Sequence, residues 1–329
     1  MRQRLYQVTN LYQNSMPAFR AKSLSFANSF KLWFRILVTI SIFVIILRSI
    51  DMDQVWKTLR QARMDLLLAA LLMQFISTSL SAYRWQLIMH NLNFGQSLSF
   101  YWRSYFKASF FNQGLPTSIG GDALKVLDVA GQGFRKRDAL FGIMLDRVTG
   151  LAALMWLNLA AYLINPNLLP SPIYHLTLLL VIGSLVGFAV VSYLKHLPWF
   201  EAYPQLRIVK TISERLHQAF LNNRIMLIGS SLLIPVLAML SIFMTGSALG
   251  LRYNLVTYFI IVPPAILLTI IPVSLAGWGI REGTLVALFS LIGADKAIIL
   301  AMSILYGLMQ IIVSLPGFII YLGGRKNLP

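Results

Sequence analysis

No cysteine occurs in the sequence, and acidic residues are scarce, with 11 Asp and Glu against 28 Lys and Arg. The absence of cysteine excludes disulfides, thiolate zinc sites, iron–sulfur clusters and cysteine nucleophiles. Charged residues make up only 12% of the 329 residues, about half of the roughly 25% that soluble domains carry. The chain has too little charge to cover a water-facing surface, which excludes an ordinary soluble enzyme and a disordered protein.

The sequence also lacks the short motifs of common enzyme active sites. It contains no G-x-S-x-G, no Walker phosphate loop and no H-E-x-x-H. Its histidines are scattered along the chain, at His90, His175, His196 and His217. We therefore predict no catalytic residues, no metal site and no cofactor.

In place of charge, the sequence has long apolar blocks, with 57% hydrophobic residues and a mean hydropathy of +0.69. A helix needs about 20 mostly apolar residues to cross the hydrocarbon layer, and six segments meet or approach this length. These predicted full spans are 33–48, 66–89, 139–164, 174–194, 225–249 and 296–322. The predicted fold class is an all-α polytopic membrane protein.

Two further apolar segments, 98–119 and 255–293, do not fit a single crossing. The first is polar in its second half, and the second is too long and contains several Pro and Gly residues. A full crossing at 98–119 would place the uncharged loop 165–172 inside and the basic segment 195–224 outside, against the positive-inside rule. We therefore predict two re-entrant segments that enter from opposite sides, with both termini cytoplasmic.

The excess of basic residues, a net charge of +17, lies mainly at the ends of apolar segments. This distribution favours orientation in the membrane and contact with anionic lipids over binding to nucleic acid. The predicted parts of the chain are a cytoplasmic basic arm 1–32, a transmembrane domain 33–323 with halves 33–164 and 174–322, a cytoplasmic amphipathic helix 200–222 and a cytoplasmic tail 324–329. The amphipathic helix fits a linker packed on the bundle as well as a lipid-sensing element.

One sequence pattern occurs at the breaks of both re-entrant segments. Residues 116–121 (P-T-S-I-G-G) and 272–277 (P-V-S-L-A-G) place Ser two residues and Gly five residues after Pro. Such breaks are tolerated at membrane depth where protein or a water-lined cavity surrounds the freed backbone groups. Two breaks that enter from opposite sides predict an inverted-repeat carrier with a central binding site. The alternative is a turn at the membrane surface without a ligand.

Charged residues occur deep inside the predicted bundle. Asp146 and Arg147 lie about seven residues into a span, where a lone charge costs several kcal/mol, and neighbours on a helix point about 100° apart. Each therefore needs a separate partner, and Arg147 or Lys125 is expected to meet a ligand phosphate or an acid such as Asp122 or Glu282. A purely structural ion pair is the alternative.

The candidate site combines cations, neutral hydrogen-bonding groups, acids and helix-breaking residues. Arginine suits a phosphate because its planar group donates two bonds at once. The predicted ligands of a lipid headgroup or phosphate are Arg147, Arg281, Lys125, Asn112, Ser118 and Ser274. The predicted charge partners or coupling residues are Asp122, Asp146 and Glu282, and the predicted breaks are Pro116, Gly120, Gly121, Pro272, Gly277 and Gly279.

Arg84 is interpreted separately, because it lies between Tyr83 and Trp85 at a span end. Aromatic and basic residues gather at membrane interfaces, so this tripeptide is expected to be an interfacial anchor. Arg103 and Lys107, on the first re-entrant segment, are expected to draw lipid headgroups or to extend to the interface.

Several of these residues occur in a combination that resembles a known family. The segments are 83–85 (Y-R-W), 111–116 (F-N-Q-G-L-P), 120–122 (G-G-D), Ala139, 146–150 (D-R-V-T-G), 271–274 (I-P-V-S) and 277–283 (G-W-G-I-R-E-G). Together they resemble the transmembrane region of the lysylphosphatidylglycerol synthase/flippase family, over about residues 35–323. Members are bacterial and archaeal inner-membrane proteins, so the resemblance implies a bacterial cytoplasmic (inner) membrane location.

The resemblance also implies work on lipids. The best-known members fuse this region to a cytosolic aminoacyl-transferase domain, and their membrane part is assigned to moving aminoacylated phosphatidylglycerol to the outer leaflet. Other relatives are linked to hopanoid transport or to polyprenyl-linked sugars. The present sequence ends a few residues after its last predicted span, so we expect the lipid-handling part without the synthase activity. Lys125 stands where relatives often have arginine, which keeps the charge but loses the planar fork.

Three functions stay open at this point. The leading hypothesis is a flippase-like transporter that moves a phospholipid or a polyprenyl- or isoprenoid-linked lipid between leaflets. The alternatives are a membrane enzyme that uses Asp122 or Glu282, and an accessory subunit of a lipid-linked glycosyl or aminoacyl transferase. The expected partners are membrane lipids, either an anionic phospholipid or a lipid-linked intermediate. A separate synthase or glycosyltransferase and a homo-oligomer are left open.

Overall fold

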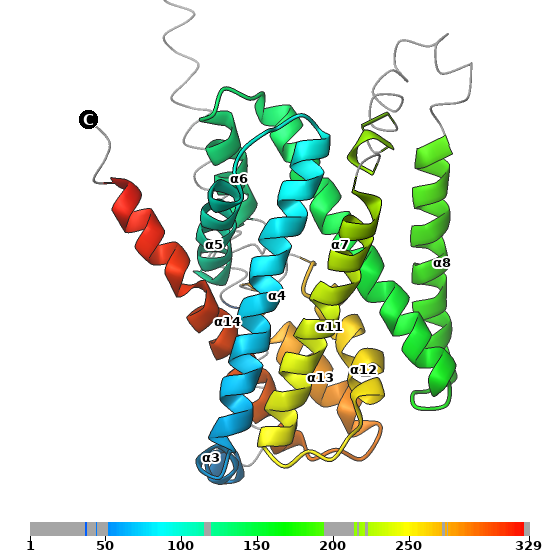
Figure 1. Cartoon of the computed structure of the whole chain (residues 1–329). Helices are drawn as coiled ribbons and strands as arrows, with labels where there is room; N and C mark the ends of the chain where they lie inside the picture. The colour runs from blue at the N-terminus through cyan, green and yellow to red at the C-terminus, as the bar shows by residue number, and fades with distance from the viewer. Residues whose placement is uncertain are drawn as a thin grey trace, which may run out of the picture.

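Figure 1 shows the computed structural model of the chain, which describes residues 52–114, 120–193, 214–215, 217–220, 223–271, 274 and 276–325, and the single residues 37 and 44. The elements of this described part are α-helices, as the all-α prediction expects. They are α3 (Met52–Arg60), α4 (Met64–Asn91), α5 (Leu98–Gly114), α6 (Gly120–Ala130), α7 (Lys136–Ile164), α8 (Ser171–Tyr193), α11 (Arg224–Ala248), α12 (Leu255–Leu268), α13 (Ile280–Ser290) and α14 (Lys296–Arg325).

Four of the described helices, α4, α7, α11 and α14, are long and apolar enough to cross a membrane. Helix α8 adds a further 23 residues of predominantly apolar sequence. These five helices coincide with five of the predicted spans. The first predicted span, 33–48, lies outside the described residues except for Leu37 and Val44, and the basic arm 1–32 lies outside them entirely.

The two faces of α4 show why these helices suit a lipid environment. Leu68 and Leu72 are 62% and 55% exposed, whereas Ser77, Ser81 and Arg84 are buried. The three buried polar residues are four and three positions apart, so they share one face of the helix. Apolar residues outside and polar residues inside reverse the pattern of a soluble bundle and match helices whose surroundings are lipid.

Both segments that were predicted to be broken are interrupted. Helix α5 ends at Gly114 before α6 begins at Gly120, and α12 ends at Leu268 before α13 begins at Ile280. In the second interruption Gly277 and Gly279 have φ angles of 81° and 84°, a region that favours glycine because it has no Cβ. Of the other predicted break residues, Pro116 and Pro272 lie outside the described residues, as does Ser118.

Two glycines allow close approach of neighbouring helices to α5. A Cβ on Gly121 would overlap the backbone carbonyl of Ala108, and a Cβ on Gly317 would overlap the backbone of Phe106 and Lys107. Because only glycine lacks a Cβ, these residues let α6 and α14 contact the backbone of α5 directly.

The two interrupted segments form short helical hairpins in opposite halves of the molecule. Helix α5 packs on α6, and α12 packs on α13. Figure 1 shows the first hairpin in the half where α4 ends, and the second hairpin in the half where α4 begins. The ends of α5 and α12 and the starts of α6 and α13 therefore lie towards the middle of the bundle.

The described helices repeat one order, long–short–short–long, first in α4 to α7 and again in α11 to α14. The contacts between the two sets are reciprocal: α5 of the first packs on α14, and α12 of the second packs on α7. The first helices of the two sets, α4 and α11, also pack against each other. Helix α8 stands outside this pairing and packs on α7.

The predicted amphipathic helix 200–222 lies largely outside the described residues. Its described part is attached to the first half of the chain. Arg215 forms an ion pair with Asp138 at the start of α7, and the Asn91 amide donates to the Ala219 carbonyl at 2.7 Å. These contacts join this part of the segment to α4 and α7, and the interpretation of the whole segment stays a prediction.

Candidate functional site

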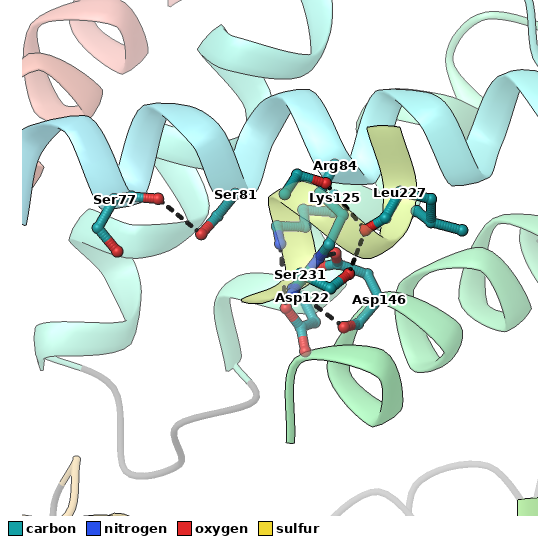
Figure 2. Close-up of polar contacts among 9 residues, drawn as sticks. Ser77, Ser81, Arg84, Asp122, Lys125, Asp146, Leu227 and Ser231 are labelled. Carbon is teal, nitrogen blue, oxygen red and sulfur yellow. Dashed lines mark hydrogen bonds and ion pairs between the residues drawn. The ribbon is translucent and has the colours of Figure 1, made fainter. Parts of the chain in front are cut away.

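A cavity of about 470 Å³ lies between the two helical hairpins and the long helices. Its lining includes Lys125 of α6 and Arg281 of α13, so both hairpins contribute a cation. Arg84 of α4 and the adjacent pair Asp146 and Arg147 of α7 complete its charged part together with Asp122. Figure 2 shows how Arg84, Asp122, Lys125 and Asp146 converge from three helices.

Arg84 and Asp146 form the most deeply buried ion pair of this cluster. The Arg84 Nε donates to Asp146 Oδ1 at 2.8 Å, and Nη2 donates to the Asp146 carbonyl at 3.1 Å. The two side chains are only 5% and 3% exposed. Gly150 makes room for the guanidinium, since a Cβ there would lie 2.9 Å from Nη2.

Asp122 lies between two cations. Arg147 donates to its Oδ2, and Lys125 Nζ lies 3.8 Å from its Oδ1. The Lys125 ammonium also lies 3.7 Å from the ring centroid of Tyr105 and 5.0 Å from that of Trp85. A cation over aromatic faces is stabilised by the ring quadrupole, which compensates Lys125 for its long distance from the carboxylate.

Arg281 and Glu282 form the corresponding group of the second hairpin. Glu282 is fully buried, and its Oε1 accepts from Arg281 Nη2 at 2.7 Å and from Ser303 Oγ at 3.2 Å. Its Oε2 accepts from the backbone N–H of Gly279 at 2.6 Å, which caps the start of α13. Glu282 therefore both begins the helix and fixes the position of Arg281.

The two hairpins share a further spacing that was not recognised in the sequence. Lys125 follows Gly121 by four residues, and Arg281 follows Gly277 by four residues. Arg281 also lies over aromatic rings, with its Cζ 5.0 Å from the centroid of Trp278. The repeated motif thus extends to one cation per hairpin, each held against aromatic residues.

The structure brings most predicted site residues together, but not all of them. Besides the charged residues above, Asn112 and Gly277 line the cavity, and the Asn112 carbonyl oxygen accepts from the Gly121 N–H at 2.7 Å. Ser274 is buried but does not line the cavity, and its hydroxyl has no hydrogen-bond partner in the described part of the chain. Gly120, Gly279 and Glu282 do not line the cavity in the described part of the chain.

The interpretation of Arg84 as an interfacial anchor is wrong. Arg84 is 4% exposed and Trp85 is fully buried, and the arginine is the partner of Asp146. The signal that could have revealed it is the spacing of Ser77, Ser81 and Arg84 on one face of an apolar helix. Lys107 likewise has a specific partner, because its Nζ lies 2.7 Å from Asp128 Oδ1.

Residues 32–317 match the family model described as the lysylphosphatidylglycerol synthase TM region. The chain belongs to this family. The match confirms the resemblance seen in the sequence motifs, and with the apolar helices it identifies a multi-pass membrane protein with a function related to membrane lipids. No curated protein matches the chain. Within the ranges that the structure describes, no group of three or more His, Asp or Glu side chains forms a metal site.

Proposed function

We propose that the protein moves a phospholipid or an isoprenoid-linked lipid between the leaflets of a bacterial cytoplasmic membrane. The observation that carries this proposal is a charged cavity of about 470 Å³ inside an apolar bundle, with a cation from each helical hairpin in its wall. Ionisable residues inside a membrane are costly and rare, and they are candidates for a functional site by default.

The charges around the cavity favour an anion. Among the described residues, four cations (Arg84, Lys125, Arg147 and Arg281) face three carboxylates (Asp122, Asp146 and Glu282), an excess of one positive charge. A phosphodiester or phosphate headgroup supplies the missing negative charge, and arginine donates to its oxygens in a bidentate manner.

Access to these cations is unequal, and Arg147 is the most open. Its side chain is 39% exposed, against 5% for Arg84, 7% for Lys125 and 11% for Arg281. We assign Arg147 the first contact with the phosphate, and Lys125 and Arg281 the contacts deeper between the hairpins.

The arrangement of the helices suits a carrier. We interpret the two hairpins as re-entrant segments that enter from opposite leaflets, because they lie in opposite halves of the bundle and their helices make reciprocal contacts. In an inverted repeat of this kind, either hairpin can open the central site to one side while the other closes it. The lipid tails would stay in the bilayer while the headgroup crosses.

The test is transfer of a phospholipid with a fluorescent acyl chain across liposomes that contain the full chain. A charge-assisted hydrogen bond contributes about 1.5–3 kcal/mol, so Arg147→Gln should slow transfer by roughly 10- to 100-fold. Arg147→Lys should recover part of the rate because it restores the charge. Arg252→Gln, which removes an exposed cation outside the cavity, is the matched control and should transfer at the original rate.

Three results would contradict the proposal. Equal transfer by Arg147→Gln and the unaltered chain would remove the assigned site. A chemically altered lipid product would favour the enzyme alternative. Transfer that depends on a separate transferase, with none from this chain alone, would favour the accessory alternative.

A further inference from the structure

Helix α12 contains two consecutive prolines, Pro263 and Pro264. A proline has no backbone N–H, so it cannot donate to the carbonyl four residues before it in a helix. The two prolines therefore leave the carbonyls of Phe259 and Ile260 without their donors within α12. Inside a membrane protein such freed carbonyls are tolerated where a neighbouring helix, a side chain or water supplies a new donor.

A single side chain of the first half supplies both donors. Asn158 lies on α7, which packs on α12. Its Nδ2 donates to the Phe259 carbonyl at 2.6 Å and to the Ile260 carbonyl at 3.0 Å. One amide nitrogen carries two N–H groups, so it can satisfy both carbonyls that the prolines free. Asn158 is fully buried, and its Oδ1 has no hydrogen-bond partner in the described part of the chain. The side chain acts here as a donor to α12.

The prolines separate two parts of this segment that have different surroundings. Before them, Tyr258, Ile260 and Ile261 are fully buried in a hydrophobic cluster with residues of α7, α11 and α14. After them, Leu268 is 42% exposed, and Ile270, just past the end of α12, is 38% exposed and lines the charged cavity. Sharp bends in helices occur mostly at proline. A bend here would turn the part that lines the cavity against the part that is held in the core.

The first hairpin is built differently. Of the four described hairpin helices, α5, α6, α12 and α13, only α12 contains proline. The reciprocal contact of the repeat, between α14 and α5, is made by Gly317 against the backbone of Phe106 and Lys107. The asparagine at two freed carbonyls is thus a feature of the second hairpin.

We propose that α12 bends at Pro263 and Pro264 to open the charged cavity, and that Asn158 is the lock that holds the helix in its closed form. While the amide bonds both carbonyls, α12 is fixed to α7. When the amide lets go, water that enters the cavity can satisfy the carbonyls. Asn158 does not line the cavity, so it is a positioning residue. The inference rests on the proposed function, because the hinge serves one of the two openings that a carrier needs.

The first experiment measures how open the cavity is. Because the chain has no cysteine, Leu154→Cys gives a single reporter thiol in the cavity wall, where Leu154 is only 5% exposed and one turn from Asn158. The full chain in detergent reacts with a charged maleimide. Adding Asn158→Leu, which removes both donors, should raise the labelling rate about tenfold, the change that roughly 1.4 kcal/mol produces. Adding the double variant Pro263→Ala/Pro264→Ala as well should return the rate to its original value, because it restores both N–H groups.

The second experiment is a double-mutant cycle on stability. Residues in one hydrogen-bond network have non-additive effects. Asn158→Leu should lower the thermal midpoint by about 5 °C in the original chain, for the loss of two hydrogen bonds, and should cost almost nothing in the double variant. Asn91→Leu is the matched control, because the buried Asn91 amide also donates to a carbonyl, that of Ala219 at 2.7 Å, which no proline frees. It should cost the same in both backgrounds.

The third experiment links the hinge to transfer of the fluorescent phospholipid in liposomes. The double variant should be at least as stable as the original chain, yet it should transfer lipid about tenfold more slowly, because a fully bonded α12 does not bend. A role confined to stability would not separate these two quantities.

The outcomes separate this inference from the proposed function. Unchanged labelling in Asn158→Leu, or an equal stability cost with and without the prolines, would overturn the lock. Transfer at the original rate by the double variant would overturn the hinge and leave the carrier standing. An absence of transfer by the unaltered chain would overturn the carrier, while labelling and stability still decide the lock. If Asn158→Leu does not fold, recovery of folding in the double variant supports the lock, and failure to recover overturns it.

Discussion

The two helical hairpins differ in how they pair a buried carboxylate with cations and hydrogen-bond donors. In the α12–α13 hairpin, the single acid Glu282 is fully buried, and its two oxygens accept from three different residues. In the α5–α6 hairpin, Asp122 is shared between two cations, and its Oδ1 has no hydrogen-bond partner among the described residues. Both oxygens of Glu282 are therefore hydrogen-bonded, whereas one oxygen of Asp122 is held only by the more distant Lys125 ammonium.

The largest expected effect on stability comes from the removal of Glu282 in the α12–α13 hairpin. Glu282→Ala would leave the Arg281 guanidinium without its carboxylate and the Gly279 N–H without its acceptor. Breaking a buried pair from one side costs about 3–5 kcal/mol, so the variant should unfold far more readily in a denaturant titration in detergent. A loss below about 1 kcal/mol would show that Glu282 does not hold this hairpin together.

The next largest effect on stability comes from the close contact between the backbones of α5 and α6. Gly121→Ala should destabilise the protein by about 1–3 kcal/mol, the usual cost of overpacking, because the new Cβ meets the Ala108 carbonyl. Gly183→Ala on α8 is the control, since a Cβ there meets nothing within 4 Å. Thermal unfolding of both variants in detergent measures the difference, and equal midpoints would argue against a tight α5–α6 contact.

Removal of the shared acid should cost less stability than loss of Glu282. In Asp122→Ala, Arg147 can turn its partly exposed side chain towards water, so we expect about 1–2 kcal/mol, the lower part of the range for an unsatisfied buried group. Lipid transfer should change more than stability, because the cavity gains a net positive charge and retains an anion longer. A stability loss equal to that of Glu282→Ala would show that the two acids stabilise their hairpins to the same extent.

The smallest expected effect, on the transfer rate, comes from exchanges between Arg and Lys, which change the geometry of the donors but keep the charge. Arg281→Lys keeps the positive charge near Glu282 but loses one of the two donors that now reach its Oε1. A hydrogen bond contributes about 1 kcal/mol, which corresponds to roughly fivefold in transfer rate. The reverse exchange, Lys125→Arg, should leave the rate within about twofold, since Lys125 is held mainly by aromatic faces. Initial transfer rates in liposomes measure both.

Hydropathy and motif spacing predicted the long helices and the two interruptions, because both depend on local sequence. Five spans and the breaks after Gly114 and Leu268 follow from apolar length and from Pro and Gly. The same reasoning predicted that Asp146 and Arg147 have different partners, because neighbouring side chains point to different faces of a helix. It did not predict that Arg84 is the partner of Asp146, because that contact depends on how α4 packs on α7.

A smaller cavity of about 200 Å³, lined by α4, α5 and α14, was also beyond the reach of the sequence. Thr78 and Ser314 are far apart in the chain, and single Ser, Thr and Gln residues are common in apolar helices. They line one cavity only because α4, α5 and α14 pack together in the fold. The spacing of Ser77 and Ser81, one helical turn apart, is in the sequence but was not recognised there.

The contact between Gly317 and the backbone of Phe106 restricts the motions that are open to α14 and α5. Two main chains that touch with no side chain between them cannot slide past each other, because any translation would drive a neighbouring side chain into the gap. Rotation about the crossing point keeps the contact intact. If one half of the bundle rocks against the other, we expect the rotation axis to pass near Gly317.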